Sequence, residues 1–317
     1  MPDLLLGTEA GVLRLQANGR LHREEGPPDV ALFAHAADGP YALTRDGALW
    51  RAAGDEGWRL VNPRPVGDEA WSLAADPRLP GRLYLGVSPA LLYRSDDGGK
   101  TWTACESVRR IPGYERWTFP PPPHIPHVRS IAPDPRTVGA VYIGVEEGGV
   151  YRSPDGGERW ESLNEGLYWD VHAVLPAPDG RRLFATTGGG FYRSADGGQS
   201  WQHAMAGLDR RYTVSLALSS ARPERLYVAA AATPPPGWRE GANAALYASD
   251  DAGARWQQLR GGLPERLDDM VSALVAGEDG GVYAAAGGTL YGSRDGGATW
   301  QRLAAGLPRV RALLLAA

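Results

Sequence analysis

Short apolar runs separated by turn residues recur along the whole chain. They often come in pairs, for example VRSIAPDP followed by AVYIGV, VHAVLPAP followed by RLFATT, and VSLALSS followed by RLYVAAA. Runs of this kind, rich in Val, Leu, Ile and Tyr and bounded by Gly, Pro and Asp, are typical of β-strands. The pattern therefore predicts an all-β chain of short strands.

A third run of each group ends in a repeated motif, Tyr-x-Ser-x-Asp-x-Gly-x-x-Trp. Its copies align without gaps as YRSDDGGKTW (93–102), YRSPDGGERW (151–160), YRSADGGQSW (192–201), YASDDAGARW (247–256) and YGSRDGGATW (291–300). Successive motif tryptophans are 58, 41, 55 and 44 residues apart. The two short steps set a period of about 42 residues, and four strands per such period are typical of a β-propeller blade. The two long steps indicate insertions.

Counting these groups predicts seven blades. Residues 30–61 lack the motif but keep the rhythm of four strands, and the N-terminus supplies only three, LLLG, GVLRLQ and RLHRE. The C-terminal VRALLLA (310–316) is then the missing inner strand of blade 1, which hides the strand edges that an open sheet would expose. We predict one domain over residues 1–317, a single seven-bladed β-propeller of four-stranded antiparallel blades closed by the C-terminal strand.

The repeated motif has a structural role in this interpretation. A short carboxylate in a tight hairpin accepts backbone N–H groups that the turn leaves unpaired, and the following glycine permits a positive φ. We expect the motif tryptophans to pack between blades. A catalytic centre needs one constellation of residues, whereas a propeller needs one such turn in each blade, so we do not assign catalysis to the motif aspartates Asp97, Asp155, Asp196, Asp251 and Asp295.

The motif resembles the Asp-box, or BNR repeat, of sialidases, xyloglucan-active glycosidases, the sortilin-type receptor propeller and the photosystem II assembly factor. The resemblance implies a propeller over the whole chain. In the enzymes of this group it implies a pocket on the face opposite the boxes. It does not select one function. Arg110, Ile111 and Pro112 match part of the sialidase Phe-Arg-Ile-Pro motif, but they follow the first box instead of preceding it, so we do not predict a sialidase.

The composition of the chain excludes several classes of binding partner and site. The 317 residues contain 33 Lys and Arg against 37 Asp and Glu, giving a net charge of −4. This balance argues against nucleic acid or an anionic membrane as a partner. The single Cys105 excludes an internal disulfide and a cysteine-based metal site. No run approaches the ~20 apolar residues of a membrane helix. The N-terminal MPDLLLGTEAG lacks a basic region, so we expect no secretion signal and a cytoplasmic protein.

Two proline-rich insertions account for the long steps. Residues 104–127 connect blade 3 to blade 4, and residues 231–244 form a loop between the two middle strands of blade 6. With the first strand of each blade innermost, both insertions belong to the face opposite the boxes. Each carries a tryptophan, Trp117 or Trp238, that we expect to be exposed. Loops on a rigid scaffold are where function concentrates.

Histidines and carboxylates gather in the loops and strand starts of blades 4 and 5 on this face. One hypothesis is a divalent metal ion, zinc, iron or manganese, bound by His124, His127 and His172 with Glu146 or Asp170. A second is an acid/base pair of Glu146 and Asp170 for glycoside hydrolysis, with His172 or Arg129 tuning the pair or binding the substrate. A third is that these groups hydrogen-bond the loop backbone and pair with arginines, or simply bind a ligand. The candidate ligand-binding residues are Trp117, Arg129, Glu147, Tyr168, Trp169, Arg211 and Tyr212.

These observations leave two functional hypotheses. The first is a small-molecule or carbohydrate-active enzyme, either glycoside-hydrolase-like or metal-assisted, with its site at the channel mouth of blades 4 and 5. The second is a non-catalytic propeller that holds a protein partner on the insertion-bearing face. A pocket with converging histidine and carboxylate groups favours the first, and a flat aromatic face without a cavity favours the second.

Overall fold

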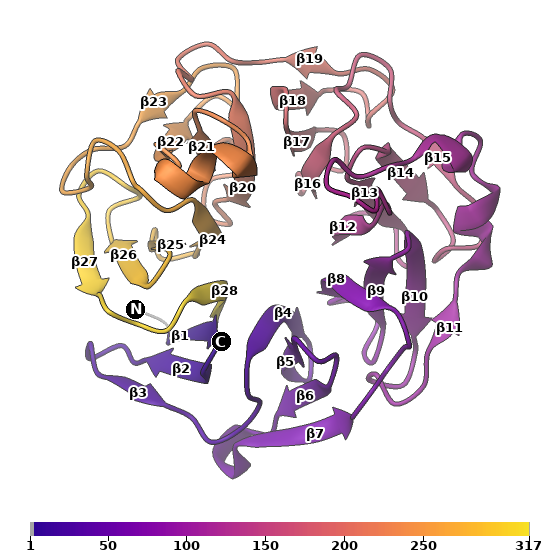
Figure 1. Ribbon diagram of the computed structural model, residues 1–317, viewed down its shortest axis with the longest axis horizontal. Coiled ribbons are helices and arrows are strands. Elements are labelled where there is room, and N and C mark those ends of the chain that lie inside the picture. Colours follow the sequence, from indigo (N-terminus) through magenta and orange to yellow (C-terminus); the bar gives the residue numbers. More distant parts are fainter. Residues whose placement is uncertain (1–2, 317) are drawn as a thin grey trace.

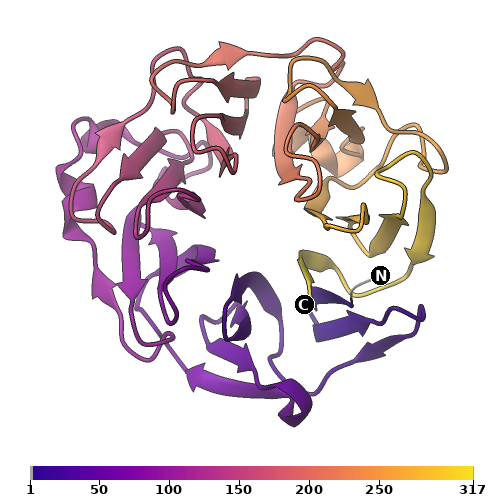
Figure 2. The ribbon, with the colours of Figure 1, turned by 180° about the vertical axis from the view of Figure 1, so that it is seen from behind.

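The computed structural model describes residues 3–316 and forms a ring of seven four-stranded antiparallel sheets (Figures 1 and 2). This confirms the predicted all-β, seven-bladed propeller. Each blade runs from an inner strand at the channel to a short outer strand. Blades 1 to 7 consist in order of β28 and β1–β3, β4–β7, β8–β11, β12–β15, β16–β19, β20–β23 and β24–β27.

The strands are short and follow the predicted runs. Their bounds are β1 Leu4–Thr8, β2 Gly11–Leu15, β3 Leu21–Arg23, β4 Val30–Ala36, β5 Gly39–Thr44, β6 Leu49–Ala52, β7 Trp58–Asn62, β8 Glu69–Ala75, β9 Leu83–Ser88, β10 Leu91–Ser95, β11 Thr103–Ala104, β12 Val128–Pro133, β13 Val141–Val145, β14 Gly149–Ser153, β15 Glu161–Ser162, β16 Val171–Pro176, β17 Leu183–Thr187, β18 Gly190–Ser194, β19 Gln202–His203, β20 Tyr212–Leu218, β21 Leu226–Ala231, β22 Ala245–Ser249, β23 Gln257–Gln258, β24 Val271–Ala276, β25 Val282–Ala286, β26 Thr289–Ser293, β27 Gln301–Ala304 and β28 Val310–Leu315.

The two ends of the chain close the ring. Strand β28 pairs antiparallel with β1, with Leu314 opposite Leu5, and the first and last strands lie side by side in blade 1 (Figure 1). Arg311 of β28 forms ion pairs with Asp29 and Glu9. The C-terminal strand is thus the inner strand of the first blade, as the sequence predicted.

Neighbouring blades are joined at their inner strands by hydroxyl groups. Ser72 of β8 donates to the Val128 carbonyl of blade 4 (2.7 Å), and Ser272 of β24 donates to the Val310 carbonyl of blade 1 (2.8 Å). Ser215 does the same from blade 6 to blade 7 (2.7 Å). Buried apolar clusters fill the space between the sheets. The inner strands are therefore held in a fixed order around the channel.

The repeated box is a self-contained hydrogen-bonded turn. Ser153 donates to the Asp155 carboxylate (3.0 Å) and accepts the Gly157 N–H (2.7 Å), while Asp155 accepts the Arg159 N–H (2.9 Å). Burial opposes ionisation of Asp155, but the hydrogen bonds from Arg159 and Ser153 outweigh it and lower its pKa to about 2. Gly157 has a φ of 102°, and a Cβ there would lie 2.5 Å from Cys105 Sγ. These contacts support the structural interpretation of the motif.

The boxes also connect one blade to the next. The indole N–H of Trp160 donates to Ser107 (2.9 Å), that of Trp201 to the Leu163 carbonyl (2.8 Å) and that of Trp256 to the Ala204 carbonyl (3.2 Å). Trp102 and Trp300 instead bond to carbonyls of their own turns.

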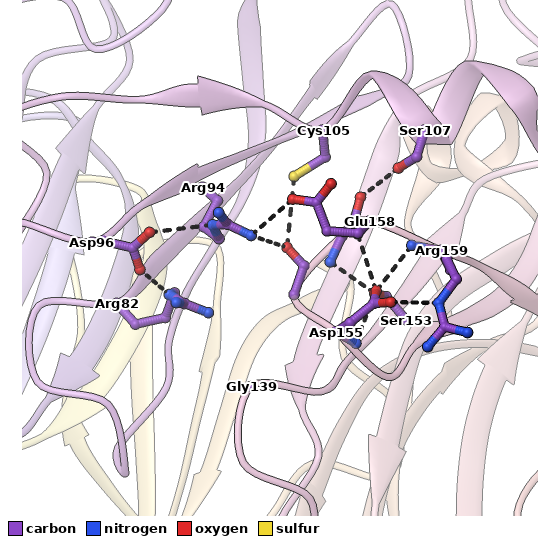
Figure 3. A network of polar contacts seen from close by, with 12 residues as sticks. Arg82, Arg94, Asp96, Cys105, Ser107, Gly139, Ser153, Asp155, Glu158 and Arg159 are labelled. Atoms are coloured by element: carbon purple, nitrogen blue, oxygen red, sulfur yellow. Dashed lines mark hydrogen bonds and ion pairs between the residues drawn. The ribbon is translucent and has the colours of Figure 1, made fainter.

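Figure 3 shows a network of polar contacts between blades 3 and 4. Arg94 of β10 donates to the Gly156 carbonyl in the next box (2.9 Å) and lies 3.4 Å from the Glu158 carboxylate. The Ser107 hydroxyl donates to the Gly157 carbonyl in the same turn. The box turn of blade 4 is therefore fixed by groups of blade 3 and of the insertion that follows it.

Both insertions contain short 3-10 helices. They are η2 Glu106–Arg110 and η3 Tyr114–Arg116 in the first insertion and η4 Pro235–Glu240 in the second, and η1 Gly54–Glu56 lies in blade 2.

The first insertion packs onto the disc. The expectation that Trp117 is exposed is wrong: it is 7% exposed, it contacts Tyr114 and Tyr151, and its indole N–H donates to the Tyr151 hydroxyl (3.1 Å). Among residues 3–316, no helix is long and apolar enough to cross a bilayer.

We predict that Ser153→Ala lowers the free energy of unfolding by about 1–3 kcal/mol, because it leaves the buried Gly157 N–H without an acceptor. Urea unfolding followed by tryptophan fluorescence measures the change. The exposed Ser220→Ala serves as the control and should change it by no more than about 0.5 kcal/mol. Equal effects of the two variants would contradict the structural role of the box.

Candidate functional site

A cavity of about 1040 Å³ lies on the face that carries the two insertions. The first insertion contributes Phe119 and the following prolines to its wall, and the second contributes residues 232–236. The remaining wall and floor come from blades 4, 5 and 6. These lining residues are Arg129, Glu146, Tyr168, Asp170, Gly188, Gly189, Arg211 and Tyr212.

An irregularity of the inner strands helps to place the floor residues. In β12 the register with β13 shifts between Val128 and Ser130, and in β16 the register with β17 shifts between Val171 and Ala173. The extra residues at these two bulges are Arg129 and His172. A bulge re-aims the side chain that it inserts, so the repeat itself creates one special position at the start of each of these strands.

Hydrogen bonds between neighbouring loops fix the two carboxylates. Glu146 directly follows β13, and the next turn is fixed by Gly148 and Gly149, whose N–H groups donate to the Trp169 carbonyl (3.1 and 3.0 Å). Asp170 follows that tryptophan, and its own carbonyl accepts the Gly188 N–H of blade 5 (2.9 Å). The loops of blades 4 and 5 are thereby joined edge to edge.

Glu146 is buried as an anion. Its Oε2 lies 3.0 Å from His127 Nε2 and accepts a hydrogen bond from Arg129. Burial opposes ionisation, but the hydrogen bond from His127 and the positive charge of Arg129 outweigh it and lower the pKa of Glu146 to about 2. The sequence did not decide between Glu146 and Glu147. In the structure Glu146 lines the cavity, whereas Glu147 is half-buried with a φ of 48°.

His127 is a buried neutral partner of Glu146. Burial lowers the pKa of His127, and this effect outweighs the hydrogen bond with Glu146, which raises it. Its ring stacks on that of Trp71, with ring centroids 3.5 Å apart, and makes a T-shaped contact with the ring of Phe119. Sequence reasoning missed both aromatic residues. Trp71 occupies the bulge of β8, between Ala70 and Ser72, which is equivalent to the positions of Arg129 and His172.

Asp170 and His172 lie beside this pair. His172 Nε2 is 3.4 Å from Asp170 Oδ1, and His172 Nδ1 is 2.5 Å from the Thr213 carbonyl oxygen. One ligand atom from each of Glu146, Asp170 and His172 lies within 4.8 Å of the other two. The structure therefore brings together the three residues proposed for catalysis.

Some of the other predicted site residues line the cavity, and others lie away from it. Arg129, Tyr168, Arg211 and Tyr212 line the cavity. His124 does not join the cluster of three: its ring is exposed and bonds the Phe119 carbonyl (2.8 Å). Trp117 lies in the core, and Trp169 is exposed at the rim. The three histidines predicted as metal ligands therefore do not form one group: His124 has a φ of 64° and an exposed ring, and His127 contacts Glu146 without joining the cluster of three.

This arrangement constrains the chemistry. An anionic Glu146 cannot donate a proton near neutral pH, so in a metal-free glycosidase it would be the nucleophile or base and Asp170 the acid. Two carboxylates and an imidazole are also a donor set for a divalent metal ion. Burial and the charge of Asp170 raise the pKa of Tyr212, which therefore stays a neutral phenol in the wall.

We predict that Arg129→Met lowers the free energy of unfolding at pH 7 by about 1–3 kcal/mol, because Glu146 stays buried without its cation. The folded-state pKa of Glu146 lies below its unfolded value of ~4.3. Its ionisation therefore stabilises the fold above that pH, and the stabilisation is lost as pH falls toward about 2. The deficit of the variant should narrow over the same range.

Urea titrations at pH 7, 4 and 3 measure this deficit. Arg266→Met, at an exposed arginine, is the matched control and should have little effect at any of these pH values. A deficit that is the same at pH 3 and pH 7 would contradict the assigned role of Arg129.

Comparison with known proteins identifies the repeat. A family model for the BNR/Asp-box repeat matches residues 93–104. A probable oligoxyloglucan-reducing end-specific xyloglucanase of Neosartorya fischeri is 27% identical over 176 residues, which are 54% of this chain and 19% of that protein. An oligoxyloglucan-reducing end-specific xyloglucanase of Emericella nidulans is 32% identical over 108 residues, 33% of this chain and 12% of that protein. The matches thus span a fifth or less of these curated relatives.

Solved structures share the fold. An ancestral GH74 enzyme and the GH74 xyloglucanase of Xanthomonas campestris each superpose with a TM-score of 0.65 at 17% identity. Each superposition covers 88% of this chain. It covers 39% of the chain of the ancestral enzyme and 46% of the chain of the xyloglucanase. YCF48 bound to D1 peptide gives 0.60 at 18% identity over 95% of this chain and 84% of its own. The resemblance to the Asp-box inferred from the motif is confirmed: the chain is a seven-bladed propeller that carries the BNR/Asp-box repeat.

Proposed function

We propose that this propeller is a carbohydrate-active hydrolase that binds a glycan in the cavity between its two insertions. The observation that carries the proposal is the convergence of two carboxylates and an imidazole, Glu146, Asp170 and His172, beside a cavity of about 1040 Å³. Converging titratable groups in the largest well-formed pocket make the default site of an enzyme.

The walls suit a sugar. Tyr168 and Tyr212 are aromatic residues that line the cavity, and the proline runs of the two insertions supply rigid apolar surface. Aromatic rings pack against apolar groups over a large area, and their hydroxyls bond polar ones. Arg129 and Arg211 add donors for hydroxyl or carboxylate oxygens. One ligand can therefore contact apolar walls and a charged floor together.

The floor suits hydrolysis. Glu146 supplies a fixed negative charge, because Arg129 and His127 keep it ionised. In a metal-free reaction Asp170 would be the acid, and His172 is a further group that can exchange a proton. Water can be activated at such a centre by a carboxylate alone or by a bound metal ion, and both routes use these same side chains.

The relatives support a carbohydrate substrate. Both curated matches are named xyloglucanases, and two structural neighbours are GH74 enzymes. This chain corresponds to less than half of each of those neighbours. We therefore place the proposed site in the cavity on one face of this propeller, where the two insertions supply walls.

We predict that the protein releases reducing ends from xyloglucan or its oligosaccharides, and that Glu146→Gln and Asp170→Asn each lower kcat at least about 100-fold. Removal of a group that acts only in the transition state costs rate more than ground-state binding. Reducing-end assays measure kcat, and quenching of tryptophan fluorescence by the oligosaccharide measures binding.

Glu165→Gln is the matched control, because Glu165 is exposed and lies outside the cavity. It should leave the rate unchanged, and circular dichroism checks that every variant folds. Absence of both binding and hydrolysis over a panel of xyloglucan, other β-glucans and their oligosaccharides would overturn the proposal.

A specific observation favours a second function, the binding of a protein segment. Among residues 3–316 the exposed large apolar side chains include Ile125, Tyr168 and Trp169, all from the loops that lead into blades 4 and 5 on this face. One structural neighbour is YCF48 bound to D1 peptide. Selection from a displayed peptide library tests this function. Enriched peptides that lose binding to Trp169→Ser, but not to Glu146→Gln, would support it.

A further inference from the structure

Two proton acceptors face each other at the floor of the cavity. Asp170 Oδ1 and His172 Nε2 are 3.4 Å apart, and within residues 3–316 neither atom has a hydrogen-bond partner. Both atoms are shielded from solvent, and the His172 side chain is fully buried. Buried polar atoms without partners cost roughly 1–3 kcal/mol each, so such a pair in a folded protein demands an explanation.

The tautomer of His172 sharpens the question. The Thr213 oxygen is a carbonyl and can only accept, so Nδ1 of His172 carries the proton of that 2.5 Å contact. In the neutral ring Nε2 then has a lone pair directed at a carboxylate oxygen. Histidines that bind metals through one nitrogen usually donate the other N–H to a backbone carbonyl or carboxylate. His172 has this arrangement.

The distance between the two acceptors fits a shared cation. Zinc binds histidine nitrogen and carboxylate oxygen at about 2.1 Å with tetrahedral angles, and two ligand atoms of one such ion are then about 3.4 Å apart. The observed separation is 3.4 Å. A charge-assisted hydrogen bond from a protonated ring would be shorter, about 2.7–2.9 Å.

Glu146 is the third candidate donor. It has a ligand atom within 4.8 Å of both other donors. Its Oε2 is already held by His127 and Arg129, which leaves Oε1 for a further contact. Partners of this kind orient a ligating carboxylate from behind. Two carboxylates also balance the charge of a divalent ion, with Arg129 adding one positive charge beside it.

We propose that Glu146, Asp170 and His172 bind one divalent transition-metal ion, best matched by zinc. Because Glu146 and Asp170 both line the cavity, an ion bound by them would lie next to the ligand space. A zinc ion with three protein ligands and one open position acts as a Lewis acid and lowers the pKa of its bound water. The inference deepens the proposed function and rests on it for the reaction, whereas the metal itself is measured separately.

The test uses the full chain without a histidine tag. The protein is stripped with EDTA, dialysed, titrated with Zn²⁺ by calorimetry, and analysed by mass spectrometry after gel filtration. We expect one equivalent of zinc. His172→Ala and Asp170→Asn should each weaken Zn²⁺ affinity by at least about 100-fold, while circular dichroism shows whether each variant folds.

His124→Ala is the matched control, because His124 is an exposed histidine on the same face and lies outside the cluster. It should bind Zn²⁺ like the unmodified protein. Substitution with Co²⁺ gives a second readout, because tetrahedral Co²⁺ absorbs visible light much more strongly than octahedral Co²⁺. We expect the intense tetrahedral spectrum, and it should vanish in His172→Ala.

Three results would overturn the metal site: no stoichiometric Zn²⁺, Mn²⁺ or Fe²⁺ after reloading, binding that persists in His172→Ala, or binding that disappears in His124→Ala. The first would leave Asp170 and His172 as a proton-sharing pair. Glycan hydrolysis by a protein that takes up no stoichiometric metal after reloading would refute the metal site but not the proposed function. Stoichiometric zinc without glycan binding would refute the proposed function but not the metal site.

Discussion

A blade of four short strands can bury both of its faces only if another blade packs on each side. Closure of the ring meets this requirement for all seven blades, and the pairing of β28 with β1 closes it. The boxes fix the outer turns, with Ser153 and its counterparts satisfying the turn internally and tryptophans such as Trp201 bonding the preceding blade. Because both sets of contacts repeat, the positions of the inner strands around the channel are determined before any loop is considered.

The candidate site uses a bulge that recurs in the inner strand of every blade. The inner strands of blades 4 and 5 each insert one residue at a bulge, and these residues are Arg129 and His172. The same position in blade 3 holds Trp71, which stacks on His127. Three neighbouring blades therefore direct an aromatic residue, a cation and an imidazole toward one part of the face. The insertions then add walls to a cluster whose geometry is set by the strands.

Local chemistry explains what the sequence could predict. The turn of each box depends on residues within five positions of one another, so its repetition revealed the period of the blades. The number of blades and the closing strand followed from the apolar runs, including those of segments without a box. Glu146, Asp170 and His172 converge because they stand at the ends or starts of predicted strands on one face. Trp117 and His124 lie in an insertion that does not repeat, and no pattern shows which side chain such a loop buries. Trp71 was missed because a bulge reverses the direction expected from strand alternation.

The same reasoning explains why the site can hold unpaired groups. Glu146 is compensated by two partners, and its low pKa shows that their combined effect exceeds the penalty of burial. Asp170 Oδ1 and His172 Nε2 lack such partners, although Gly188 packs so tightly that a Cβ there would lie 2.0 Å from Asp170 Oδ2. A frame fixed by seven sets of interblade contacts can hold these two acceptors together without relaxing. Within residues 3–316, other buried polar atoms of the ring also lack partners, among them Asp76 Oδ2 and Tyr283 Oη, but Asp170 Oδ1 and His172 Nε2 are two acceptors that face each other at the cavity. A cation bound between them would supply the missing partner for both atoms.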